Sequence, residues 1–336
     1  MSRNKNNADI PSLIRSFLIE HLLNNQNASP ATVKSYSEVI RMLLEYLQEY
    51  HRIRPEKIVL KDLSTKNILG FLDYLQKERK NSINTRNSRL AVIRSFINYL
   101  LLVNPTWSAD LRGILAIPVK KSSKMVVDYL SQEEMNLLLE TPNGSTWSGQ
   151  RDRALLLVMY NTGARVSEIA HLKVADVTLE SRSGKIYLFG KGRKKRALPL
   201  WKNTVRILRE WIKRNGYTSE MPLFPNKQGK TMSRWGITNR LSEAVSKLSI
   251  LRPSLKNRNI SPHTIRHTTA MHFLQSGIDI TTVSMWLGHE SIETTQIYVT
   301  ADMEMKEKAL KTLQEPTTKV FRFKPSDSLL AFLENM

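Results

Sequence analysis

The stretch Ser261-Pro262-His263-Thr264-Ile265-Arg266-His267 explains more of this chain than any other segment of similar length. Serine followed by proline is typical of the start of a helix, which places His263 and Arg266 three residues apart on one helical face. Free backbone N–H groups and the positive end of the helix dipole make such a position favourable for a phosphate. Gly277 is placed to end this helix. The pattern therefore predicts an anion-binding helix start.

A second group of polar residues lies further along the chain, between Asp279 and Tyr298. Asp279 is typical of the start of another helix and Gly288 of its end, so His289 is expected in the turn beyond that helix. Ser291 is then expected to cap a helix that carries Tyr298. If the two helices pack together, one pocket could hold His263, Arg266, His289 and Tyr298.

An isolated arginine, Arg165, lies about a hundred residues upstream in Thr162-Gly163-Ala164-Arg165. Taken singly, each residue has an ordinary explanation: a hydrogen-bonded histidine, a surface cation or salt-bridge partner of Glu168, a half-buried tyrosine. Taken together, they supply a phenol nucleophile, proton-transfer groups and fixed cations. Cleavage of a phosphodiester without a metal requires that combination, so we expect no metal and no cofactor.

The composition indicates a folded protein with a polyanionic partner. The chain has 336 residues, 41% of them hydrophobic, and a net charge of +21 that is distributed over both halves. Basic surface gains affinity for nucleic acid by releasing condensed counterions, although a generally basic protein such as a ribosome-associated factor has the same property. Without cysteine, disulfides and thiolate chemistry are excluded. No signal-peptide pattern and no apolar run of about 20 residues is present, so we expect a cytoplasmic protein.

The N-terminal third is expected to be all-helical, from about residue 10 to 105. Ser29-Pro30 begins a helix with an apolar face, and a second helix carries Leu90, Ile93 and Ile97. Basic and amide side chains on its other side form a face that either contacts DNA or is simply solvated. The arginines of this predicted DNA-binding face are Arg86, Arg89 and Arg94.

Residues 118–128 have the composition of a linker, which is either a hinge or an exposed loop. The sequence therefore predicts an N-terminal helical domain at 1–117, a second domain at 129–315 and a tail at 316–336. The second domain begins with a capping box, Ser131 with Glu134. Two β-like runs at 185–189 and 196–200 then indicate a hairpin with a basic tip. Its DNA-contacting candidates are Lys191, Arg193, Lys194 and Lys195.

The motifs resemble those of the tyrosine recombinase (integrase) family, which includes Xer-like, phage and transposon-encoded members. They are Thr-Gly-Ala-Arg-Val-Ser-Glu-Ile at 162–169, Gly-Lys-Gly at 190–192, His-Thr-Ile-Arg-His at 263–267, Leu-Gly-His-Glu at 287–290 and Tyr298. The match covers about residues 130 to 300. It implies a mainly α fold: a helical core-binding domain and an α-rich catalytic domain with a small antiparallel sheet, forming a C-shaped clamp on DNA.

The resemblance also implies roles for the residues. Tyr298 would attack the scissile phosphate to form a 3′-phosphotyrosine, Arg165 and Arg266 would grip the non-bridging oxygens, and Lys191 would protonate the leaving 5′-oxygen, with Lys194 and Lys195 as neighbouring candidates. His263 would exchange a proton with the tyrosine, His289 would donate a hydrogen bond to the phosphate, and Glu168 would orient the pocket. ATP is not needed, because the covalent link conserves the phosphodiester energy.

The implied partners are duplex DNA with specific recombination sites and further copies of the chain, as dimers and a tetrameric synapse, with accessory recombinases as a further option. The resemblance suggests that a short amphipathic helix at about 326–333 docks on a neighbouring subunit; docking on its own domain and disorder are the alternatives. A type IB topoisomerase, a metal-dependent transposase or nuclease, and a noncatalytic DNA-binding protein are the alternative functions. Phage integration, chromosome-dimer resolution and transposition are all compatible with the residues. The short segment before the first strong helix cap slightly disfavours a phage integrase with a separate arm-site DNA domain.

Overall fold

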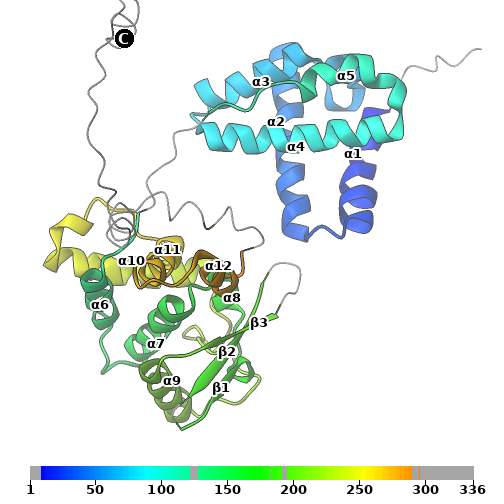
Figure 1. Cartoon of the computed structure of the whole chain (residues 1–336). Coiled ribbons are helices and arrows are strands. Elements are labelled where there is room, and N and C mark those ends of the chain that lie inside the picture. Colours follow the sequence, from blue (N-terminus) through cyan, green and yellow to red (C-terminus); the bar gives the residue numbers. More distant parts are fainter. Residues whose placement is uncertain (1–8, 122–127, 182, 191–194, 290–294, 296–336) are drawn as a thin grey trace, which may run out of the picture. The chain divides into compact units, whose positions relative to one another are not determined.

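The computed structural model describes residues 9–121, 128–181, 183–190, 195–289 and 295. The chain divides into two compact units, 1–124 and 125–336 (Figure 1). The buried hydrophobic residues of the two units form separate clusters. The domain limits derived from the sequence stay a prediction.

The regular elements in the described part of the first unit are all helices. Helix α1 (Ile10–Ser16) continues into a π-helix (Phe17–Asn25), and short 3₁₀ turns lie at Pro55–Lys57, Leu60–Asp62 and Pro105–Trp107. Helix α4 packs against α2, α3 and α5 around a core that includes the fully buried Phe17, Phe71 and Leu90. The bounds of the other helices are α2 (Pro30–His51), α3 (Thr65–Lys77), α4 (Ile83–Val103) and α5 (Ser108–Leu115).

Serine caps explain where three of these helices begin. Ser29, Ser64 and Ser82 each accept a hydrogen bond from the backbone N–H three residues later, at 3.1–3.2 Å. These bonds satisfy N–H groups that lack a partner within the helix. The start of α2 at Ser29-Pro30 agrees with the sequence pattern.

The position of Arg86 on α4 differs from the one predicted from the sequence. Arg86 is 2% exposed, because it falls in helical register with Leu90, Ile93 and Ile97 on the core side. Its Nη1 donates to the backbone carbonyl of Pro118 at 3.2 Å. The expected outward position of Arg86 is therefore wrong. Arg86 instead holds the segment that follows α5.

The other two arginines of the predicted DNA-binding face are partly exposed. Arg94 donates to the carbonyl of Ile117, next to the bond made by Arg86. Arg89 follows Arg86 by about one helical turn on α4 and is half-buried. DNA contact by Arg89 and Arg94 stays a prediction.

The second unit surrounds helix α7, which packs against α9 and α11 (Figure 1). Every residue from Ala154 to Thr162 is buried, as expected for a helix covered on all sides. Short 3₁₀ turns lie at Val174–Asp176 and Pro253–Leu255. The described helices are α6 (Gln132–Glu140), α7 (Trp147–Thr162), α8 (Val166–Ala170), α9 (Lys202–Asn215), α10 (Arg234–Leu251), α11 (Pro262–Gln275) and α12 (Ile280–Leu287).

A small antiparallel sheet completes this unit in the order β1-β2-β3. Its strands are β1 (Val177–Leu179), β2 (Gly184–Phe189) and β3 (Lys195–Pro199). Ile186 is paired with Val177 on one side and Leu198 on the other. Ile186, Leu188 and Leu198 are buried, so the alternation along β2 and β3 fixes which face of the hairpin packs inward.

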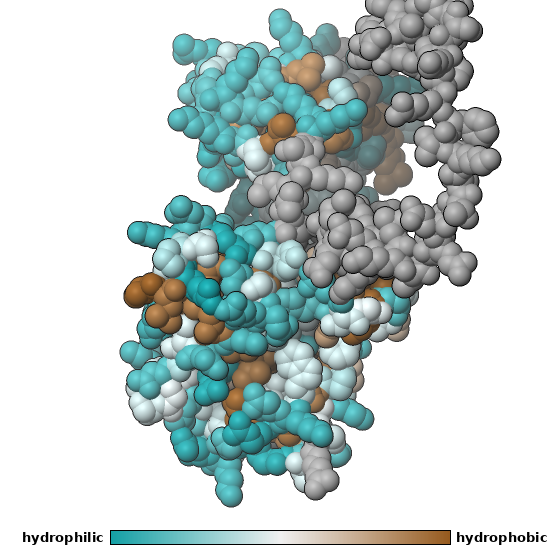
Figure 2. Space-filling view, turned by 60° about the vertical axis from the view of Figure 1, so that its left-hand side comes forward, coloured by the Kyte–Doolittle hydropathy of each residue, from teal (hydrophilic) through white to brown (hydrophobic). Residues whose placement is uncertain are grey.

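The mainly α fold with a small antiparallel sheet is confirmed. On the face drawn in Figure 2, hydrophilic residues predominate and apolar residues form small separate groups. Within the described ranges, no helix has the length and apolar character needed to cross a bilayer.

Candidate active site

Arg165 is presented by the sharp turn between α7 and α8. Gly163 ends α7 with φ of +58°, and a Cβ there would lie 2.4 Å from Leu287 Cδ2. Both the backbone conformation and the lack of space therefore favour glycine at this position. Arg165 then begins α8, and its backbone N–H donates to Glu168 Oε2 at 2.7 Å. Its side chain is 38% exposed. The turn is thus fixed while the guanidinium stays accessible.

Arg266 lies buried on α11 and joins the ends of two other helices. It is 3% exposed; its Nη1 donates to the carbonyl of Gly163 at 2.7 Å and its Nη2 to that of Leu287 at 2.8 Å. The planar guanidinium presents its donors in a rigid fork, so it holds the two carbonyls in a fixed geometry. His263, one turn earlier on α11, is exposed at the start of the same helix.

His289 follows directly after the end of α12. Asp279 caps the start of this helix, and Gly288 ends it with φ of +67°. Arg165 Nη2 donates to the carbonyl of Gly288 at 3.1 Å, so both arginines bind the turn that leads into His289. Nδ1 of His289 lies 2.8 Å from Thr295 Oγ1 and shares a hydrogen bond with it. The structure therefore gathers Arg165, His263, Arg266 and His289 around one turn.

The histidines of this group are held in the neutral form. Loss of solvation, followed by the charges of Arg266 and Arg165, lowers the pKa of His263 below its usual value, although its ring remains exposed. Burial and the same two arginines lower the pKa of His289 to about 4. Near pH 7 each ring has one donor and one acceptor nitrogen. Neutral imidazoles of this kind can transfer a proton or donate to a phosphate oxygen.

Two further residues belong to the site, although the sequence motifs assigned neither of them a role. His267 stacks edge-on against His263 with ring centroids 4.0 Å apart, and burial, with His263 and Arg266, lowers its pKa to about 4. Arg196, on β3, forms a bidentate pair with Glu168 at 2.8 and 2.9 Å. The signal for Arg196 was the buried carboxylate opposite it, which only the folded structure reveals.

Glu168 is held ionised by these arginines. Burial alone would raise the pKa of Glu168, but the hydrogen bonds and charge of Arg196, and then those of Arg165, lower it below 4.5. A cleft of about 360 Å³ opens beside this carboxylate. Arg165, Glu168 and Gly190 are among its lining residues, so the arginine turn and the end of β2 border the same recess.

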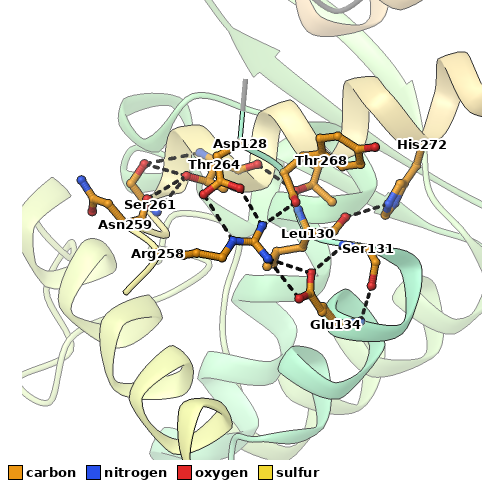
Figure 3. A network of polar contacts seen from close by, with 11 residues as sticks. Asp128, Leu130, Ser131, Glu134, Arg258, Asn259, Ser261, Thr264, Thr268 and His272 are labelled. Atoms are coloured by element: carbon orange, nitrogen blue, oxygen red, sulfur yellow. Dashed lines mark hydrogen bonds and ion pairs between the residues drawn. The ribbon is translucent and has the colours of Figure 1, made fainter. Parts of the chain in front are cut away.

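A polar network anchors the start of α11 to the first described residues of the second unit (Figure 3). Arg258 donates to Asp128 at 2.7 Å and to both carboxylate oxygens of Glu134 at 3.0 and 3.1 Å. On α11, Thr268 Oγ1 accepts from the N–H of Leu130 at 3.0 Å. Segment 128–134 is thereby fixed to the helix that carries His263 and Arg266.

Several predicted site residues lie outside the described part of the chain: Tyr298, Lys191, Arg193, Lys194 and the tail at 316–336. Lys195 is described at the start of β3, where its Nζ lies 4.2 Å from the centre of the Tyr187 ring and 5.6 Å from that of Phe189. In the residues that are described, no group of three or more His, Asp or Glu is arranged to hold a metal ion.

Comparison with known proteins decides the family. Residues 128–305 match the phage integrase family, and residues 14–99 match the phage integrase SAM-like domain. The chain is 38% identical to a putative integrase/recombinase, y4rC, of Sinorhizobium fredii over 329 residues, 98% of this chain and 99% of that protein. The chain belongs to the phage integrase family. The resemblance found in the motifs is thus confirmed.

Other relatives refine the class of this integrase-family protein. Tyrosine recombinase XerC of Pelobacter propionicus is 32% identical over 308 residues, covering 90% of this chain and 96% of that protein. Among solved structures, XerH site-specific recombinase bound to a palindromic difH substrate has the same fold, with a TM-score of 0.70 and 22% identity over 92% of this chain and 90% of that one. This integrase-family member is therefore a tyrosine recombinase.

Proposed function

We propose that this integrase-family protein is a site-specific DNA recombinase that works through a 3′-phosphotyrosine. The Tyr298 oxygen attacks the scissile phosphorus, the bond to the 5′-oxygen breaks, and a free 5′-hydroxyl leaves. A 5′-hydroxyl from a second strand then reverses the step and rejoins the DNA. The observation that carries the proposal is the convergence of Arg165, Arg266, His263 and His289 beside one turn.

Charge stabilisation falls to the two arginines in this mechanism. The pentavalent phosphorus carries extra negative charge on its non-bridging oxygens, and preorganised guanidinium groups offset it without reorganising. Arg266 is preorganised by two carbonyls and Arg165 by one. Glu168 holds Arg165 through its backbone N–H and its Nη1. Glu168 acts on the arginine and not on the substrate.

Proton transfer falls to the histidines and Lys191. The Tyr298 phenol gives up its proton to His263, whose lowered pKa keeps it a neutral acceptor. His289 donates a hydrogen bond to the phosphate. Lys191 protonates the leaving 5′-oxygen; support for its placement comes from Gly190, the residue before it, which lines the same cleft as Arg165.

The proposed partners are duplex DNA carrying a recombination site and further copies of the chain, in the cytoplasm where that DNA lies. The net charge of +21 favours a polyanion. A solved structure of the same fold is a lambda integrase tetramer bound to a Holliday junction, with a TM-score of 0.61 and 15% identity over 86% of this chain and 79% of that one. By analogy we infer a dimer on each site and a tetramer during strand exchange.

A covalent-trapping experiment tests this function. The wild-type protein first selects its site from a random pool of duplexes, and a nicked version of that site then traps the adduct in the presence of EDTA. We expect a DNA-linked peptide containing Tyr298, and no adduct from Tyr298→Phe, whereas Tyr217→Phe, outside the site, behaves like the wild type. Attachment through another residue, or none at all, would refute the proposal.

The same DNA separates the alternatives. Joining of two sites indicates a recombinase, whereas relaxation of supercoils without joining indicates a topoisomerase of type IB. Tight binding with no adduct under any condition indicates a noncatalytic DNA-binding protein.

A further inference from the structure

Three arginines from distant parts of the chain donate to three successive carbonyls at the end of α12. Arg196 Nε binds the carbonyl of Trp286 at 3.1 Å, Arg266 that of Leu287 at 2.8 Å, and Arg165 that of Gly288 at 3.1 Å. The last carbonyls of a helix have no partner within it, and the negative end of the dipole favours cations. These bonds therefore fix the turn from which His289 emerges.

Arg196 differs from the other two because it also holds the carboxylate that positions Arg165. Its side chain is 14% exposed and that of Glu168 is 3% exposed. Arg196 Nη1 and Nη2 take one oxygen of Glu168 each, while Nε is left for Trp286. Each Glu168 oxygen also accepts from Arg165. One guanidinium thus connects β3, α8 and the end of α12.

The packing at Gly288 shows how closely Arg196 covers this turn. A Cβ built on Gly288 would lie 3.0 Å from Arg196 Nη1 and 3.2 Å from its Cζ. The guanidinium therefore lies against the backbone of the residue that precedes His289, and no side chain larger than hydrogen fits between them without a shift.

We propose that Arg196 is a positioning residue of the cleavage site, which aligns Arg165 through Glu168 and His289 through the end of α12. The inference rests on the proposed function, since it concerns the same reaction. Arg196 touches no reacting atom. Its bidentate geometry is the essential feature, because a point charge would balance Glu168 without reaching Trp286.

Arg196→Lys separates geometry from charge. The lysine keeps a cation beside Glu168 but cannot make three bonds in one plane. We expect its thermal midpoint and DNA affinity to stay near those of the wild type, while the rate of adduct formation on the nicked duplex falls about 100-fold through misplacement. Arg206→Lys, on the exposed face of α9, is the matched control and should leave the rate unchanged.

A second variant gives a readout that a merely structural role would not affect. In Arg196→Met the largest stabilising influence on the Glu168 carboxylate is lost, so the pKa of this buried group rises. Protonated Glu168 no longer accepts both bonds from Arg165. The acid limb of the rate–pH profile should therefore move to higher pH in Arg196→Met and stay in place in Arg206→Lys.

The outcomes distinguish this inference from the function on which it rests. If the wild-type protein forms no adduct, the proposed function fails. If the wild type forms the adduct and folded Arg196→Lys does so at the same rate, the positioning role is overturned. If Arg196→Met does not fold, the lysine variant decides alone.

Discussion

His267 and His289 enter the folded state as neutral imidazoles, because burial and nearby cations lower the pKa of each from 6.5 to about 4. The unfolded chain binds protons at these histidines below about pH 6.5, whereas the folded chain does so only near pH 4. The contribution of these two histidines to the free energy of unfolding is therefore fully present above about pH 6.5 and is lost progressively as the pH falls toward 4. His263 and His272 add to the loss in the same direction.

Urea denaturation of the second unit, followed between pH 8 and pH 4, measures this dependence. We expect a midpoint that is constant above about pH 7 and declines below about pH 6.5. The double variant His267→Gln/His289→Gln should flatten the decline, whatever its stability at pH 8. An equally steep decline in the double variant would show that other groups cause the pH dependence.

Two glycines with the same backbone conformation allow the end of α12 to be tested as an element. Gly288 and Gly216 end α12 and α9 with φ of +67° and +61°, but a Cβ meets Arg196 at the first and nothing within 4 Å at the second. Gly216→Ala should cost only the left-handed strain, about 1 kcal/mol. Gly288→Ala should cost roughly 3 kcal/mol, because crowding adds to the strain.

Calorimetry on the two variants checks the difference, and adduct formation should fall only in Gly288→Ala. Equal losses of stability would mean that the turn yields to the extra methyl group. In that event the close approach of Arg196 would have little energetic importance.

The anchor between segment 128–134 and α11 can be tested through Arg258. Its side chain is 25% exposed and that of Glu134 is 19% exposed, so removal of the arginine leaves a half-buried carboxylate. Arg258→Met should destabilise the second unit by about 2 kcal/mol. Arg41→Met breaks an exposed pair on α2 and should cost no more than about 0.5 kcal/mol. Chemical denaturation measures both, and equal values would contradict the anchoring role.

Helix ends were the elements most predictable from sequence, because each depends on a few neighbouring residues. Ser29, Ser131, Ser261 and Asp279 cap helices as their patterns indicate. Strand β1 has only three residues, too few to show a periodic pattern. The apolar residues of the π-helix at 17–25 are also compatible with an α-helix, so the sequence does not distinguish the two. Neither element could be predicted from its local sequence alone.

Side-chain partners far apart in sequence were less predictable. Arg196 and Glu168 are 28 residues apart, and nothing in a basic cluster shows which cation points inward. Arg86 shows the same difficulty. A helical face with three arginines was predicted to contact DNA or to be solvated, yet Arg86 lies on the core side of the helix. Helix caps were therefore predicted correctly, whereas long-range side-chain pairing was not.

On the scale of the whole molecule, the two units have separate hydrophobic clusters, which predicts separate unfolding. Phe71 is fully buried in the first unit, and Phe71→Ala should cost that unit about 3–5 kcal/mol. Hydrogen exchange should rise in peptides of residues 9–121 and not in those of 128–289. Phe189→Ala, at a site 52% exposed, is the control. Faster exchange in both units would show that they unfold together.

The gathering of Arg165, Arg196 and Arg266 at the end of α12 also bears on how the protein is made. A ribosome delivers these arginines one after another, and the carbonyls that they bind, at residues 286–288, are synthesised after all three. No truncated product that stops before this point has the turn they bind. Premature termination therefore yields fragments in which these arginines lack their partners at the end of α12.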